Sequence, residues 1–325
     1  MQLLKNKYII ITAVAAILAC AYLASSSYVN GYATDRIESF LIKNNLDNVV
    51  KYESISASLL GRACINNVVI SDNVADVEIG SICVDDIDEK NENITGLSIF
   101  ANGLNVPLAR IARKNLYWVK NASNPVFRVL AVGATDFACN LVVNYDYDPS
   151  RQVASMSVSN FIPELGSVNI QYRFDHVRQS LPDLFAKGSE TFSNGAKINL
   201  FAGLGFLQNA SSLSEMRLAD YKVIINNEPY VERLNQIETA STPKDKSTWN
   251  DLLPSLSKER LIKNGMMPSE ASEFVSVYNK WKAHGGEVEF RSDLKRPLPV
   301  LEFVTSRIGG GIESFFGVTH CQVSM

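Results

Sequence analysis

The sequence has few of the residue patterns from which active sites are usually built. Its three histidines, His176, His284 and His320, do not occur at a spacing typical of a zinc site. It has no GxSxG nucleophile motif and no complete glycine-rich phosphate loop. We therefore predict a protein that is not an enzyme and that has no catalytic residues, no cofactor and no metal site.

The sequence also lacks a large excess of either positive or negative charge. Lysine and arginine together number 31, aspartate and glutamate number 34, and the basic residues form no long run. Nucleic acid is therefore excluded as an expected partner, because binding it requires a concentrated basic surface. Asp146 and Asp148 resemble a catalytic carboxylate pair, but they precede Pro149 in a turn-like segment. Aspartate in such a turn usually accepts hydrogen bonds from the backbone.

A long apolar run near the start is the most informative feature that the sequence does have. Tyr8 to Ala24 is almost uninterrupted in apolar residues, and Lys5 and Lys7 precede it. As a helix, this run covers most of a bilayer core about 30 Å thick. Positive charges before the run place the N-terminus in the cytoplasm. We expect a single-pass anchor, with the bulk of the chain outside the cytoplasm.

Two other fates of this segment stay open. Ala19-Cys20-Ala21 matches the small-residue pattern of a signal-peptide cleavage site. Alternatively, residues 17–20 form a loose lipobox in which Cys20 would receive a lipid.

The four cysteines after Cys20 suit a compartment in which disulfides form. The segments 63–71 and 76–84 are rich in valine and isoleucine and are separated by a turn-like stretch. An antiparallel hairpin centred between residues 73 and 74 places Val68 opposite Ile79 and Cys64 opposite Cys83. Directly opposed residues lie within disulfide reach. We predict a Cys64–Cys83 bridge, and the alternative is a pair of reduced, buried cysteines.

A second bridge follows only by elimination. If Cys64 pairs with Cys83 and Cys20 lies in the membrane segment, then Cys139 and Cys321 remain as a pair.

The rest of the chain predicts an α+β, β-dominated fold. Strand-like patterns prevail from Val49 to about residue 175, with a meander over residues 136–175. A helix is expected over Pro268 to His284 and should end at Gly285. Its apolar stripe contains Phe274, Tyr278 and Trp281, which we expect to pack on the sheet or to line a groove.

These patterns suggest three parts. Residues 1–29 would be the cytoplasmic stub and transmembrane anchor, residues 30–245 a β-rich extracytoplasmic domain, and residues 246–325 a C-terminal helix-strand section. The sheet is expected to be curved and mainly antiparallel, with the C-terminal helical section packed on it.

The segment VKYESISASLLGRACINNVVISD, residues 50–72, follows the predicted anchor and a short helix. Over about residues 1–90 the chain resembles AsmA-like and related membrane-anchored periplasmic proteins of bacteria. The resemblance implies a single-pass protein of the bacterial inner membrane, with its bulk in the periplasm and an elongated antiparallel sheet.

Two functions are compatible with this resemblance. The first is the binding or handling of lipid or another hydrophobic ligand in the cell envelope, because an incompletely covered apolar sheet face offers a surface to acyl chains. The second is an envelope scaffold or assembly factor that binds another protein without a ligand groove.

Overall fold

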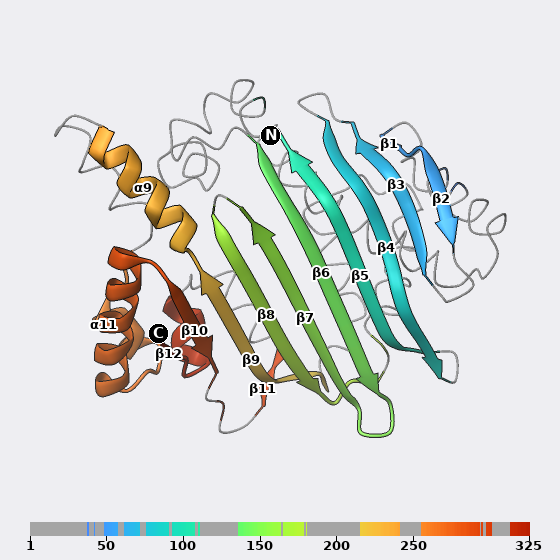
Figure 1. Ribbon diagram of the computed structural model, residues 1–325. Helices are drawn as coiled ribbons and strands as arrows, with labels where there is room; N and C mark the ends of the chain where they lie inside the picture. Colours follow the sequence, from blue (N-terminus) through green and yellow to red (C-terminus); the bar gives the residue numbers. More distant parts are fainter. Residues whose placement is uncertain are drawn as a thin grey trace. The chain divides into compact units, whose positions relative to one another are not determined.

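The computed structural model describes residues 49–57, 62–71, 76–90, 93–107, 136–163, 165–178, 215–240, 255–292, 297–300 and 313–325, and the single residues 38, 42, 110, 180 and 294. As predicted, the fold is β-dominated, with a large antiparallel sheet and a few helices (Figure 1). No helix among these residues is long and apolar enough to cross a membrane. The predicted anchor, Tyr8 to Ala24, lies outside the described residues.

The chain divides into two compact units. The first unit comprises Met1–Val106, Ala138–Met156 and His176–Met216, and the second comprises Pro107–Phe137, Ser157–Asp175 and Arg217–Met325. The two predicted domain boundaries, after residues 29 and 245, lie outside the described residues. The division into 1–29, 30–245 and 246–325 therefore stays a prediction.

The first unit contains a sheet whose strand order is β1-β3-β4-β5-β6, with β2 also paired to β3. Neighbouring strands from β3 to β6 run in opposite directions (Figure 1). The strands are β1 (Val50–Lys51), β2 (Ser54–Ala57), β3 (Ala63–Ile70), β4 (Val77–Lys90), β5 (Asn93–Val106) and β6 (Phe137–Asp148).

The β3–β4 hairpin has the predicted register. Val68 lies opposite Ile79 and Cys64 lies opposite Cys83. The β4 strand is longer than predicted, because it continues beyond Val84 through the acidic stretch to Lys90. Acidic residues are depleted in strands, and for this stretch the sequence favours a solvated strand end or a loop.

Strict alternation of buried residues is interrupted at the same level in three strands. Buried positions follow each other at intervals of two along β3, but Ile65 and Val68 are three residues apart. Ile79 and Ile82 in β4 show the same interval. Asn67 lies in this interval with a φ of 51°. A residue in this left-handed region disturbs the pleat of the strand. The side chains after it therefore point to the opposite faces from those that strict alternation would give.

The corresponding position in β5 is Gly103, whose φ is 63°. The residues on either side of Gly80 in β4 pair with those around Asn67 and around Gly103. Because the three irregular positions are in register, the strands stay paired while their burial pattern shifts by one residue.

The second unit contains part of β7 (Val153–Ile162) and the strands β8 (Gly166–Asp175), β9 (Arg217–Asn226), β10 (Glu287–Arg291), β11 (Leu298–Pro299) and β12 (Gln322–Ser324). Its strand order is β7-β8-β9-β10-β12, and β11 pairs with β9. Its helices are α9 (Glu228–Ala240), α10 (Lys258–Lys263) and α11 (Pro268–His284).

The C-terminal helix was predicted correctly. Pro268 is its first residue, and the carboxylate of Glu270 accepts a hydrogen bond from the backbone N–H of Met267 at 3.1 Å. Gly285 closes the helix with a φ of 70°, and its N–H donates to the carbonyl of Trp281. Proline at the start and glycine just after the end are the expected boundary residues.

A helical segment over residues 313–318 was not predicted from the sequence. Phe315 and Phe316 in this segment are buried, and Phe316 lies 4.9 Å from Phe274 between ring centroids. Tertiary packing of these two aromatic side chains explains the helical conformation better than local propensity does.

Candidate functional site

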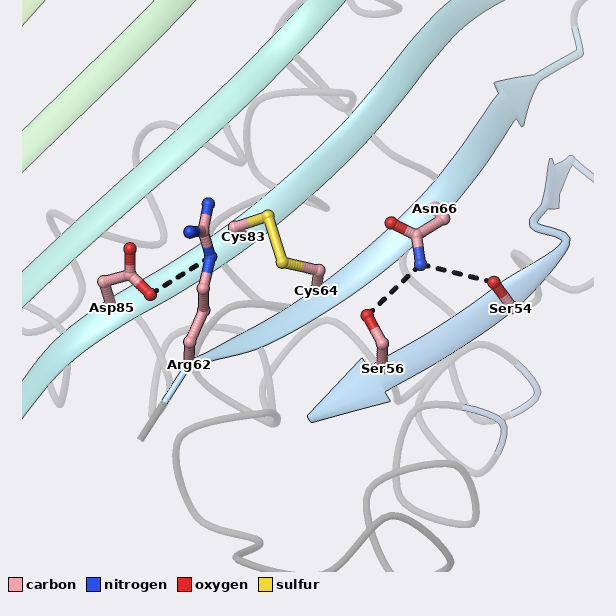
Figure 2. Close-up of a disulfide and its surroundings, with 7 residues drawn as sticks. All are labelled: Ser54, Ser56, Arg62, Cys64, Asn66, Cys83 and Asp85. Carbon is pink, nitrogen blue, oxygen red and sulfur yellow. Dashed lines mark hydrogen bonds and ion pairs between the residues drawn. A yellow bond between two sulfur atoms is a disulfide. The ribbon is translucent and has the colours of Figure 1, made fainter. Parts of the chain in front are cut away.

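The predicted cysteine pair joins the start of β3 to the middle of β4. Cys64 and Cys83 are bonded, and their Cα atoms lie 4.0 Å apart (Figure 2). Cys83 is buried, whereas Cys64 is half-buried.

Polar side chains flank the disulfide on both sides (Figure 2). On one side, the Nε of Arg62 lies 3.4 Å from a carboxylate oxygen of Asp85. On the other side, the amide nitrogen of Asn66 donates to the hydroxyl oxygens of Ser54 and Ser56, at 3.2 and 3.3 Å. The Asn66 amide therefore fastens the short edge strand β2 to β3.

The polar positions continue across β4 and β5. Ser81 lies opposite both Asn66 in β3 and Asn102 in β5, and Asp85 lies opposite Ser98. Opposed residues project from the same face of a sheet. We call this surface the polar face, and it comprises Ser54, Ser56, Arg62, Asn66, Ser81, Asp85, Ser98 and Asn102 around the disulfide, with Asn140 and Asn144 from β6.

The predicted helix stripe lies in an aromatic core of the second unit. Phe274, Tyr278 and Trp281 are 1%, 4% and 4% exposed. The Phe274 ring contacts that of Phe290 in β10, with centroids 5.9 Å apart, and the Trp281 ring meets Phe290 edge-on at 6.3 Å. These three side chains therefore pack between α11 and the sheet.

The same sheet face becomes less covered away from α11. In β10, Val288 and Phe290 are 0% and 4% exposed. Their direct partners in β9, Ile225 and Val223, are only half-buried. The next partners, in β8, are also half-buried; they are Val168 opposite Ile225 and Ile170 opposite Val223.

We call Val168, Ile170, Val223 and Ile225 the apolar strip. The sequence predicts β8 as part of the meander over residues 136–175, but it does not predict this surface. The alternation of apolar and polar residues was a signal for one apolar face, but no sequence signal showed how far α11 covers that face.

A buried polar cluster anchors the C-terminal segment to β9. The Tyr221 hydroxyl lies 2.9 Å from that of Thr319, and the Ser292 hydroxyl donates to Asp220 at 2.7 Å while accepting from the Tyr221 N–H at 2.9 Å. Burial raises the pKa of Tyr221 far above its ordinary value. The tyrosine therefore stays neutral and has a structural role.

Cys321 and Cys139 are both buried, in the second and first unit respectively. Burial raises the pKa of the Cys321 thiol to about 12, so the thiol stays protonated at neutral pH and is a poor nucleophile. Because the two cysteines belong to different units, the Cys139–Cys321 bridge stays a prediction.

Asp148 has the predicted turn role. Its carboxylate accepts hydrogen bonds from the N–H groups of Ser150 and Arg151, at 2.9 and 3.1 Å, and from the Ser150 hydroxyl at 2.6 Å. The Ser150 hydroxyl bond is the largest contribution that lowers the pKa of this carboxyl below its ordinary value. Within the described ranges, no group of three or more His, Cys, Asp or Glu side chains is arranged to hold a metal ion.

Compared with known proteins, the sequence matches no family model and no curated protein. The resemblance of about residues 1–90 to AsmA-like proteins therefore stays a prediction.

Proposed function

We propose that this protein is a membrane-anchored envelope protein that binds a lipid or another hydrophobic ligand through the apolar strip of its second unit. The observation that carries the proposal is the uneven cover of one sheet face. Phe290 packs against Phe274 and Trp281 of α11 and Val288 is fully buried, whereas their partners in β9 and β8 stay half-buried. Apolar surface left in contact with water favours a binding partner.

The strip has the chemistry of an acyl-chain surface. All four of its side chains are aliphatic, and they form two opposed pairs, Val168 with Ile225 and Ile170 with Val223. Burying apolar area contributes about 25 cal/mol per Å². A ligand that covers several half-buried aliphatic side chains therefore gains binding free energy from the area that it removes from water. The strip contains no polar group that would select a particular headgroup.

The cellular setting is part of the proposal. The apolar run from Tyr8 to Ala24 predicts an anchor in the bacterial inner membrane, and the Cys64–Cys83 disulfide supports a periplasmic location for the bulk of the chain. A protein held at the bilayer surface would meet lipid at high local concentration.

Lipid co-purification tests this proposal. We expect the full chain to retain phospholipid through size-exclusion chromatography, and we expect the double variant Ile170→Thr/Val223→Thr to retain at least several-fold less. Threonine is β-branched and suits a strand, but its hydroxyl makes the strip polar. The measurement is lipid extraction and mass spectrometry at equal protein concentration.

Gln171→Ala serves as the control, because Gln171 is exposed between Ile170 and Tyr172 on the other face of β8. Equal lipid retention by wild type, Gln171→Ala and the double variant would show that the strip does not bind lipid. That result, together with a protein recovered by crosslinking in cells, would favour the envelope scaffold or assembly factor.

A further inference from the structure

The Cys64–Cys83 disulfide lies in a row of opposed residues that crosses the sheet of the first unit. Ser56 in β2 is opposite Cys64, and Phe100 in β5 is opposite Cys83. Directly opposed residues project from the same face of a sheet, and their side chains are neighbours. The disulfide therefore has a serine beside one of its sulfur atoms and a phenylalanine beside the other.

The two ends of this row differ in size and in exposure. Ser56 is exposed and has a small side chain, whereas Phe100 has an aromatic ring and is half-buried. The cysteines differ in the same direction, since Cys64 is half-buried and Cys83 is only 3% exposed. Among the strands that the structure describes, none pairs with the outer edge of β2. The accessible side of the disulfide is therefore the one that faces β2.

This asymmetry determines which sulfur atom a thiolate can attack. A thiolate approaches a disulfide sulfur in line with the S–S bond, from the side opposite the sulfur that leaves. Because the bond joins neighbouring strands, in-line attack on Cys64 comes from the β2 side, past Ser56 (Figure 2). In-line attack on Cys83 would come from the β5 side, where Phe100 lies. Access therefore favours Cys64 as the attacked residue and Cys83 as the leaving group.

The hairpin would keep the two cysteines opposed after the bond opens. Ile65 lies opposite Ile82, and Val68 lies opposite Ile79. All four side chains are at most 5% exposed, and their burial stabilises the pairing of β3 with β4 without the S–S bond. The same two sulfur atoms can therefore form the bond again without a rearrangement of the strands.

We infer that Cys64–Cys83 is an exchangeable disulfide, which an external thiol opens by attack on Cys64. The external thiolate forms a bond to the Cys64 Sγ while the Cys64–Cys83 bond breaks. The electron pair of that bond leaves with the Cys83 Sγ, which takes a proton from water. A second external thiolate then attacks the external sulfur of the mixed disulfide and displaces Cys64, which is protonated in turn. Two external thiols are thereby oxidised to one disulfide, and the two cysteines are reduced to thiols.

Reaction of the folded full chain with reduced glutathione tests this inference. The reaction is quenched by alkylation at early times, and the adducts are located by peptide mass spectrometry. We expect the first mixed disulfide to form at Cys64, about tenfold or more in excess over Cys83, because access decides which sulfur is attacked. We also expect the rate to stay constant when urea is added below the unfolding transition, since the attack needs no unfolding.

Ser56→Phe should slow the reaction about tenfold, because it places a ring on the approach to Cys64 while phenylalanine suits a strand. Ser155→Phe is the matched control, since Ser155 is an exposed serine of β7 in the same unit and should react as wild type does. The inference is overturned if reduction requires unfolding by urea, if the first adduct forms at Cys83, or if Ser56→Phe reacts as fast as wild type. The inference does not depend on lipid binding, because the apolar strip lies in the other unit.

Discussion

Phe274→Ala is expected to destabilise the second unit by about 3–5 kcal/mol, the range observed when a buried phenylalanine is truncated. Phe274 is 1% exposed, and its ring contacts those of Phe290 in β10 and Phe316 near the C-terminus. Its removal would leave a cavity where α11, β10 and the segment at 313–318 meet. The expected result is a large loss of amide-exchange protection in these three segments.

Lys280→Ala is the matched control, because Lys280 is exposed on the same helix. Alanine has a high helix propensity, and we expect this change to shift stability by less than about 0.5 kcal/mol. If Phe274→Ala destabilised the protein as little as Lys280→Ala, then α11 would not be packed on the sheet. The apolar strip would then not be defined by where α11 stops covering the sheet face.

Removing the disulfide is expected to destabilise the first unit by about 3 kcal/mol. Cys64 and Cys83 are 19 residues apart, and a crosslink that closes a loop of this size restricts the unfolded chain by that amount in the chain-entropy model. The measurement is denaturant unfolding of Cys64→Ala/Cys83→Ala, compared with wild type in the presence and absence of a dithiol reductant.

The reductant provides the internal control. Wild type should lose stability when it is reduced, whereas the double variant should not respond. If reductant did not change the stability of the wild-type protein, then Cys64 and Cys83 would be a reduced pair. This is the alternative that the sequence also allowed.

The local features of the fold could be predicted from the sequence. The register of the β3–β4 hairpin could be predicted from the alternation of apolar and polar residues. It also followed from the position of the turn, which lies midway between the segments 63–71 and 76–84. The α11 boundaries followed from Pro268 and Gly285. In both cases neighbouring residues determine the structure, so that a short stretch of sequence contains the necessary information.

Features that depend on contacts between distant segments could not be predicted from the sequence. The helical turn at 313–318 depends on burying Phe315 and Phe316 against other elements. The apolar strip depends on where α11 stops covering the sheet. The polar face depends on the register of β2 to β6, because Asn66 and Asn102 are 36 positions apart and meet in one row only through Ser81.

Site-mapped photocrosslinking tests the central claim most directly. Cells expressing the full chain would be fed a photoactivatable fatty acid that enters their phospholipids, and the adducts would be located by peptide mass spectrometry. The account predicts adducts on β8 and β9, at or beside Val168, Ile170, Val223 and Ile225, and their loss in Ile170→Thr/Val223→Thr. Adducts that avoid these two strands, or that persist unchanged in the double variant, would contradict it.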